Sequence, residues 1–252
     1  LLLVEDNKDL CQLIKLQLED KFNIHIANNG VDGLKKVHLY HPDIVVTDQM
    51  MPEMDGLEML QSIRKDFQIS HIPVIILTAK NDEGAKTKAI TLGANAYITK
   101  PFSKEYLLAR IDQLLSERLL FRERIRLQME NQKTTEEDSY EQYLVKKDVQ
   151  FLEKIHQVIE ENMDDSDFNI DTIASGIGLS RSAFFKKLKS LTGLAPVDLV
   201  KEIRLNKSVE LIKNTDLSIS EIAFAVGFKD SGYYSKCFRK KYNQTPREYM
   251  SE

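Results

Sequence analysis

The residues whose side chains are best suited to carry out chemistry lie where short apolar runs end. Glu5 and Asp6 follow the first such run of the chain, and Asp48 follows the third. Thr78 and Lys100 follow the fourth and the fifth. Clustered carboxylates repel one another and call for a cation, and oxygen ligands with open positions suit Mg²⁺, which keeps several waters and bridges to phosphate. Taken singly, each residue is more often a helix cap or a surface group, whereas four such places are hard to attribute to capping.

The combination of these side chains predicts phosphoryl transfer. A metal ion beside Asp48 keeps its carboxylate ionised and nucleophilic, and it neutralises charge on an incoming phosphoryl group. Lys100 can hold one phosphoryl oxygen, and the hydroxyl of Thr78 can donate to another. The expected product is an acyl phosphate on Asp48.

These residues need a scaffold that brings separate strand ends together, and the first 120 residues predict one. Apolar runs predict five strands, at 1–4, 22–27, 44–46, 71–77 and 96–99. Amphipathic spacing and capping residues predict five helices, which start after Asn7, at Val31, at Leu57, after Asn81 or Asp82, and after Ser103. The alternation indicates a doubly wound α/β fold with a five-stranded parallel sheet that is covered on both faces. Because the carboxyl ends of parallel strands share one edge, the polar residues should converge in one crevice.

The motifs that carry these residues resemble the receiver domain of response regulators, over residues 1 to about 120. They are Val4-Glu5-Asp6-Asn7, Thr47-Asp48-Gln49-Met50-Met51-Pro52-Glu53-Met54-Asp55-Gly56, Leu77-Thr78-Ala79 and Tyr97-Ile98-Thr99-Lys100-Pro101-Phe102. The resemblance implies that a partner histidine kinase phosphorylates Asp48.

The same resemblance assigns roles around the phosphoacceptor. It implies that Thr78 and Tyr97 form a switch, in which Thr78 moves toward the phosphoryl group and Tyr97 turns inward behind it. It also implies a cis peptide bond between Lys100 and Pro101. Finally, it implies that Mg²⁺ is held by Asp6, Asp48 and the backbone carbonyl of Met50, and by Glu5, often through a water molecule.

The second half of the chain contains an internal repeat. Ile173–Ser180 recurs as Ile222–Phe228, with Asp230 as the cap after a one-residue insertion. Each copy combines a helix, a glycine turn, an N-cap and a second helix, which is the helix-turn-helix pattern. Two basic runs at equivalent places predict contacts with DNA phosphates, although the whole chain has a net charge of −4. The basic residues are Arg181, Lys186, Lys187 and Lys189 in the first copy, and Lys236, Arg239, Lys240 and Lys241 in the second.

The two copies also align in their apolar residues. Phe184 matches Tyr234 and Leu188 matches Phe238, and we expect Tyr234 and Phe238 in the core rather than on DNA. A helix predicted from Pro196 to Leu211 joins the copies. Three of its apolar residues are expected to face inward, namely Val200, Ile203 and Leu211.

Residues 150–250 resemble the DNA-binding domain of the AraC/XylS family of transcription regulators. The resemblance is carried by Ala174…Gly178-x-Ser180, Thr192-Gly193-x-x-Pro196, Ile203-Arg204-Leu205, Ile219-x-x-Ile222-Ala223, Val226-Gly227-Phe228, Tyr234-x-x-x-Phe238-Arg239-Lys240 and Thr245-Pro246-x-x-Tyr249. It implies that six residues face base edges, which are Ser182, Phe185 and Lys186 in the first copy and Gly232, Tyr233 and Lys236 in the second. It implies that phosphates are bound by Arg181, Arg239 and Lys240.

These signals divide the chain into a receiver domain at 1–120, a helical extension and linker at 121–147, and an AraC-type DNA-binding domain at 148–252. The apolar spacing beyond the receiver fits one long helix packed on the sheet, and it also fits a helical stalk that pairs with a second copy. The polar and acidic stretch 131–139 is expected to be the linker.

The combination predicts a cytoplasmic two-component response regulator that is not itself an enzyme. Phosphorylation of Asp48 would control dimerisation and sequence-specific binding to double-stranded DNA, and would thereby regulate transcription by RNA polymerase. One alternative is a receiver that serves only as a phosphate sink or an interaction module. Another is a phosphatase of the haloacid-dehalogenase type, which places its nucleophile in an Asp-x-Asp motif on the first strand, where this chain has Glu5-Asp6-Asn7.

The remaining features of the sequence concern the cellular environment of the chain and the longer protein from which it could come. No run of about 18 apolar residues is long enough to span a membrane. Cys11 and Cys237 lie far apart, form no metal-binding spacing and are expected to be reduced. The chain begins with Leu1, inside a predicted strand, rather than with Met. We therefore expect a shortened stand-alone regulator or the C-terminal part of a hybrid protein that joins sensor, kinase and regulator, in which case this would be the cytoplasmic portion of a membrane protein.

Overall fold

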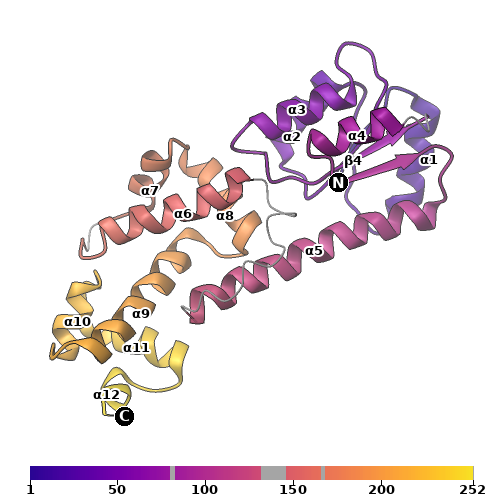
Figure 1. Ribbon diagram of the computed structural model, residues 1–252. Coiled ribbons are helices and arrows are strands. Elements are labelled where there is room, and N and C mark those ends of the chain that lie inside the picture. The colour runs from indigo at the N-terminus through magenta and orange to yellow at the C-terminus, as the bar shows by residue number, and fades with distance from the viewer. Residues whose placement is uncertain (80–82, 132–145, 166–167, 252) are drawn as a thin grey trace. The chain divides into compact units, whose positions relative to one another are not determined.

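The computed structural model describes residues 1–79, 83–131, 146–165 and 168–251. The chain divides into two compact units, of which one contains Leu1–Phe121 and the other contains Val149–Glu252 (Figure 1). The linker predicted at 131–139 lies outside the described residues apart from Asn131, and so do the predicted caps Asn81 and Asp82. No helix within these described ranges is long and apolar enough to cross a membrane.

The first unit contains a parallel sheet with the strand order β2-β1-β3-β4-β5. This order is one of the two common arrangements of a doubly wound sheet, and it confirms the predicted fold class. The strands are β1 (Leu2–Val4), β2 (His25–Ala27), β3 (Val45–Asp48), β4 (Val74–Thr78) and β5 (Ala96–Thr99).

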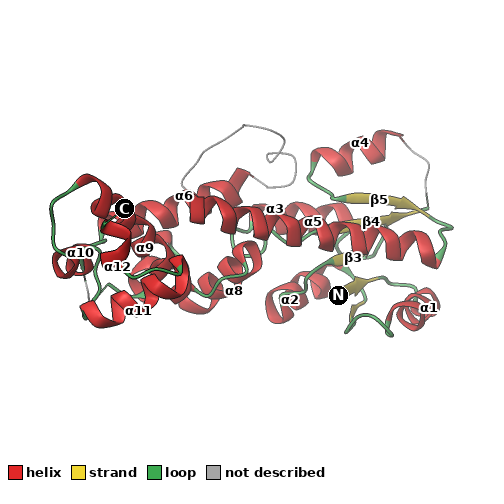
Figure 2. Ribbon diagram, turned by 90° about the horizontal axis from the view of Figure 1, so that it is seen from below, coloured by secondary structure: helices red, strands yellow, loops and turns green. Residues whose placement is uncertain are grey.

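Five helices cover both faces of this sheet, whose strands are yellow in Figure 2. Successive strand residues point to opposite faces, so each strand supplies both cores. Leu3 and Val46 pack with α1 and α5, whereas Leu2 and Val45 pack with the other three helices. The helices are α1 (Lys8–Leu18), α2 (Gly30–Tyr40), α3 (Gly56–Lys65), α4 (Glu83–Thr91) and α5 (Lys104–Asn131).

Two strands of the first unit begin three residues later than predicted. β2 begins at His25 because the backbone N–H of Phe22 still donates to the carbonyl of Leu18, which closes the end of α1. β4 begins at Val74 because the guanidinium of Arg64 binds carbonyls in the preceding turn. The predicted cap Asn7 is confirmed, since its side chain accepts hydrogen bonds from the backbone at the start of α1.

The second unit is all-helical and contains two helix-turn-helix pairs, α7–α8 and α10–α11, as predicted. The long helix α9 connects them in the chain and ends at Asn214, three residues beyond the predicted end. The helices are α6 (Lys146–Glu161), α7 (Ile170–Ile177), α8 (Arg181–Thr192), α9 (Pro196–Asn214), α10 (Ile219–Ala225), α11 (Ser231–Tyr242) and α12 (Pro246–Met250).

The aligned apolar residues of the repeat form the cores of the two pairs. Phe184, Leu188, Tyr234 and Phe238 are all fully buried, which confirms that Tyr234 and Phe238 belong to the core. The prediction for α9 was only partly correct, because Val200 and Leu211 are half-buried. This helix packs against more than one neighbour, so its buried residues form more than one stripe: Leu199, Ile203, Leu205 and Ile212.

The turns of the two pairs offer a matched test of local packing. Gly178 and Gly227 have similar positive φ angles, 78° and 79°. A Cβ atom at Gly178 would meet nothing within 4 Å, whereas one at Gly227 would lie 2.4 Å from the carbonyl oxygen of Met163.

We expect Gly178→Ala to lower the free energy of unfolding by about 1–2 kcal/mol, the cost of a left-handed residue. The steric conflict should make Gly227→Ala about 1–3 kcal/mol worse still. Urea unfolding followed by circular dichroism measures both, and equal losses would contradict the close packing at Gly227.

Candidate functional site

Four neighbouring strands deliver the predicted polar residues to one edge of the sheet. Thr47, the residue before Asp48, lies beside Val4, the residue before Glu5, and Asp48 itself lies beside Leu77. Thr78 in turn lies opposite Thr99, which precedes Lys100. The expected convergence is therefore confirmed, because the register aligns the carboxyl ends of β1, β3, β4 and β5.

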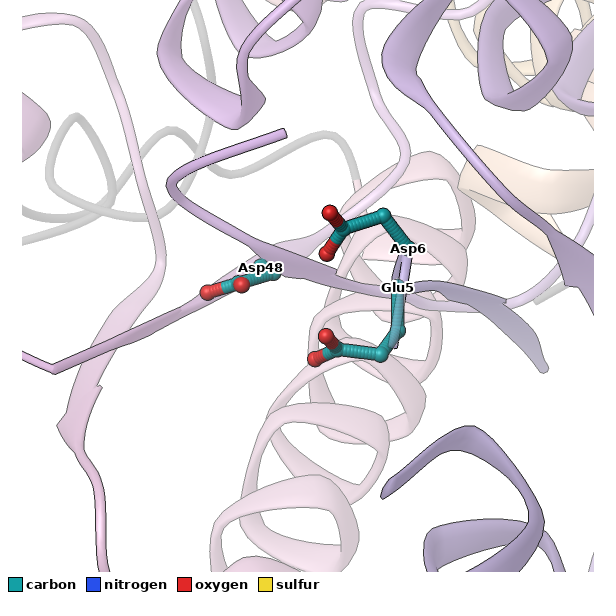
Figure 3. Close-up of side chains that lie close together, drawn as sticks. All are labelled: Glu5, Asp6 and Asp48. Atoms are coloured by element: carbon teal, nitrogen blue, oxygen red, sulfur yellow. The ribbon is translucent and has the colours of Figure 1, made fainter. Parts of the chain in front are cut away.

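Three carboxylates come together at this edge. Glu5, Asp6 and Asp48 each offer an oxygen atom, and these atoms lie within 4.8 Å of one another. Figure 3 shows the three carboxylates directed into the same space. The Glu5 side chain is only 1% exposed and Asp48 is also buried, whereas Asp6 is open to solvent. This all-oxygen donor set with an open side fits Mg²⁺, which takes oxygen ligands and retains water.

Lys100 neutralises part of the charge of this cluster. Its Nζ atom lies 2.8 Å from Oε2 of Glu5 and 3.2 Å from Oδ1 of Asp48. Burial raises the pKa of the Glu5 carboxyl above its ordinary value, and the hydrogen bond from Lys100 offsets this only in part. The peptide bond between Lys100 and Pro101 is cis, as expected. One ammonium group against three carboxylates leaves the site negative and therefore suited to a further cation.

The two oxygens of Asp48 have different surroundings. Oδ1 accepts a hydrogen bond of 2.8 Å from the backbone N–H of Gln49 in addition to its contact with Lys100. No hydrogen bond to Oδ2 is formed within the part of the chain that the structure describes. Thr78 is buried at the end of β4, and the exposed side chain of Met50 leaves only its backbone carbonyl for the site.

Gln49 is a residue that the sequence interpretation missed. The hydroxyl of Tyr97 donates to Oε1 of Gln49 at 3.2 Å, and the backbone of Gln49 holds Asp48. Gln49 thus connects the carboxylate with the predicted switch residue Tyr97. Its position directly after Asp48 was the available signal, although a neutral side chain there gave no indication of the partner on β5.

In the second unit, the residues expected to face DNA are on the surface of α8 and α11. All nine of the predicted base-facing and phosphate-binding positions are exposed, although Arg181 also forms a 3.0 Å ion pair with Asp171. The exposed positions are Arg181, Ser182, Phe185, Lys186, Gly232, Tyr233, Lys236, Arg239 and Lys240.

Two lysines of the basic runs are not available for phosphate contacts. Lys187 is fully buried, and its ammonium lies 5.0 Å from the centroid of the Phe151 ring. Lys241 donates to Glu202 and, at 2.6 Å, to Oδ1 of Asn206. The prediction that these two lysines contribute to the DNA surface was therefore wrong, because both are held by residues of the same unit.

The carboxylate cluster can be tested for cation binding without any assumption about its reaction. Asp6→Asn removes one of three charged donors, so we expect it to weaken Mg²⁺ binding, whereas Asp9→Asn, at the exposed start of α1, should not. Calorimetric titration and thermal unfolding with and without Mg²⁺ would measure this, since a ligand at one hundred times its dissociation constant stabilises by about 2.7 kcal/mol. Equal Mg²⁺ affinity in the wild type and in Asp6→Asn would remove Asp6 from the site.

Comparison with known families assigns both halves of the chain. Residues 1–112 match the model of the response regulator receiver domain, and residues 173–252 match the model of a helix-turn-helix domain. The solved receiver domain of the response regulator 1452 from Francisella is 33% identical, covers 46% of this chain and 95% of that one, and has a TM-score of 0.44.

Curated relatives cover the chain to different extents. A protein of Formosa agariphila named histidine kinase P4 is 35% identical over the whole of this chain, which spans only 18% of that relative. The response regulator ArlR of Staphylococcus aureus is 39% identical over 46% of this chain and 52% of its own length. The chain therefore joins a response-regulator receiver domain to a helix-turn-helix domain of the AraC type.

Proposed function

We propose that a histidine kinase phosphorylates Asp48 and that this phosphorylation controls the pairing of two copies and their binding to DNA. The observation that carries the proposal is the position of Lys100, which contacts both Glu5 and Asp48 at the edge of a three-carboxylate cluster. Such a cluster serves phosphoryl transfer, because it places a nucleophilic carboxylate, a cation site and a fixed ammonium within a few ångströms.

The geometry suggests which oxygen of Asp48 reacts. Because Oδ1 is already held by Gln49 and Lys100, Oδ2 is the oxygen that attacks phosphorus as the bond to the kinase histidine nitrogen breaks. Lys100 then moves from the carboxylates to a phosphoryl oxygen, and Thr78 donates to another. Mg²⁺, bound by Glu5, Asp6, Asp48 and the carbonyl of Met50, would neutralise charge on the phosphoryl oxygens.

The switch would pass through Gln49. When Thr78 moves toward the phosphoryl group, Tyr97 would leave its hydrogen bond with Gln49 and turn inward. This movement changes the surface formed by α4, β5 and α5, through which two copies would pair. The pair would present four helix-turn-helix units to double-stranded DNA and thereby regulate RNA polymerase.

In this proposal, residues 1–120 are the receiver that is phosphorylated, residues 121–147 are the extension and linker, and residues 148–252 bind DNA. The chain would act as a regulator and not as an enzyme, and DNA binding would place it in the cytoplasm. The likeness to a relative named as a histidine kinase supports the idea that sensor and kinase segments belong to the same parent polypeptide.

Phosphorylation can be tested with acetyl phosphate and Mg²⁺. We expect the intact mass of the wild type to increase by one phosphoryl group, because Asp48 is the nucleophile, and we expect Asp48→Asn to remain unlabelled. Asp43→Asn, which changes an exposed aspartate just before β3, should be labelled like the wild type. Labelling that persists in Asp48→Asn would exclude Asp48 as the acceptor.

DNA binding can be tested with two lysines of the same helix. Lys236→Ala removes an exposed charge, so it should weaken binding to promoter DNA and reduce the slope of log K against log salt by about one unit. Lys241→Ala removes a lysine that is already bound by Glu202 and Asn206, so the slope should stay unchanged. Fluorescence anisotropy over a range of salt concentrations measures both slopes. An unaltered slope in Lys236→Ala would contradict a phosphate contact there.

A further inference from the structure

The DNA-binding unit contains a cavity that the proposed function does not use. Its volume is about 530 Å³, within the range of small-molecule sites. The walls come from the start of α7, from α8, from α9 and from the segment that leads into α11. The cavity is therefore lined by both helix-turn-helix pairs and by the helix that joins them.

Most of the lining is apolar. Val197 and Val200 lie on one face of α9, and aromatic rings of Phe168 and Phe228 add to the walls. Val197 and Tyr233 are 60% and 56% exposed, although both are large apolar side chains. A ligand with an apolar body would cover these two residues and gain the free energy of removing them from water.

Arg204 lines the same cavity and forms no ion pair among the residues that the structure describes. One Nη atom donates to the carbonyl of Gly227 and the other to the carbonyl of Asp165, each at 2.8 Å. Its Nε atom is buried and has no hydrogen-bond partner among the residues that the structure describes. Burial lowers the pKa of this guanidinium, and the Asp165 carboxylate opposes that shift less strongly. An anion in the cavity would give this guanidinium the ion pair that it does not form with the described residues.

We propose that this cavity binds a small molecule with an apolar body and a single carboxylate, which pairs with the guanidinium of Arg204. The apolar walls argue against a phosphate, including one from the DNA backbone, because a phosphate has no apolar body that could cover them. A monocarboxylate satisfies both the charge and the walls.

Occupation of the cavity would act on DNA binding. Arg181 and Tyr233 line the cavity and are also two of the residues proposed to contact DNA. The bound molecule and DNA would therefore compete, and this consequence rests on the proposed function. Ligand binding itself does not rest on the proposed function. The binding of the ligand and its competition with DNA can therefore be tested separately.

The binding test uses the full chain without DNA and octanoate as the probe, with 1-octanol as its uncharged match. Calorimetric titration should show octanoate binding, and 1-octanol should bind about tenfold or more weakly because it lacks the charge that Arg204 attracts. Val200→Trp should fill the cavity and weaken octanoate binding more than about tenfold. Lys207→Trp adds the same side chain at an exposed position of α9 outside the cavity and should bind like the wild type.

A second pair of variants tests the same cavity without filling it. Val197 is at the exposed rim, so Val197→Asp and Val197→Lys should both fold and should change octanoate affinity in opposite directions, by about five- to tenfold overall. Neither should change the binding of 1-octanol. Equal octanoate binding in all four variants would exclude this cavity, and equal binding of octanoate and 1-octanol would exclude the anionic ligand. With DNA present, octanoate should lower DNA affinity in the wild type and not in Val200→Trp.

Discussion

The repulsion among three carboxylates is the interaction on which the first unit depends. Two unit charges 4 Å apart repel by about 1 kcal/mol in water and by about 4 kcal/mol at the lower dielectric constant of a protein surface. Glu5 and Asp48 are buried, so part of the favourable hydration of their charges is lost. The parallel register prevents these side chains from moving apart, because β1 and β3 are paired up to Val4 and Thr47. Lys100 balances only part of this charge, and the site therefore stays negative and suited to a cation.

The second unit uses its charges differently from what a count of basic residues suggests. Helices α8 and α11 each carry four lysine or arginine residues, yet in each helix one lysine stabilises the fold. Lys187 lies against Phe151, and Lys241 is bound by Glu202 and Asn206. A lysine has a long apolar stem, so it can be buried where an aromatic ring or a carboxylate receives its ammonium group. The positive surface is therefore formed by fewer residues than the sequence suggests.

The parts of the structure that follow from local rules were predictable from sequence. β5 was predicted with the bounds that it has, because Gly93 and Pro101 limit it on both sides, and the edge of the sheet followed from the alternation of strands and helices. Features that depend on distant partners were not predictable. The late start of β4 is caused by Arg64, and the role of Gln49 requires Tyr97, 48 residues away. Sequence spacing describes one element at a time, whereas these contacts join different elements.

The two helix-turn-helix pairs differ in how firmly their turns are attached to the rest of the unit. The turn at Gly178 has open space around it, whereas the turn at Gly227 lies against Met163 and against the guanidinium of Arg204. Arg204 also donates to the carbonyl of Gly227, so a hydrogen bond joins α9 to the segment that leads into α11. The same arginine lines the cavity of the second unit. A charge placed in that cavity would therefore act on the residue that holds the turn before α11, and the turn before α8 has no equivalent attachment within the described residues.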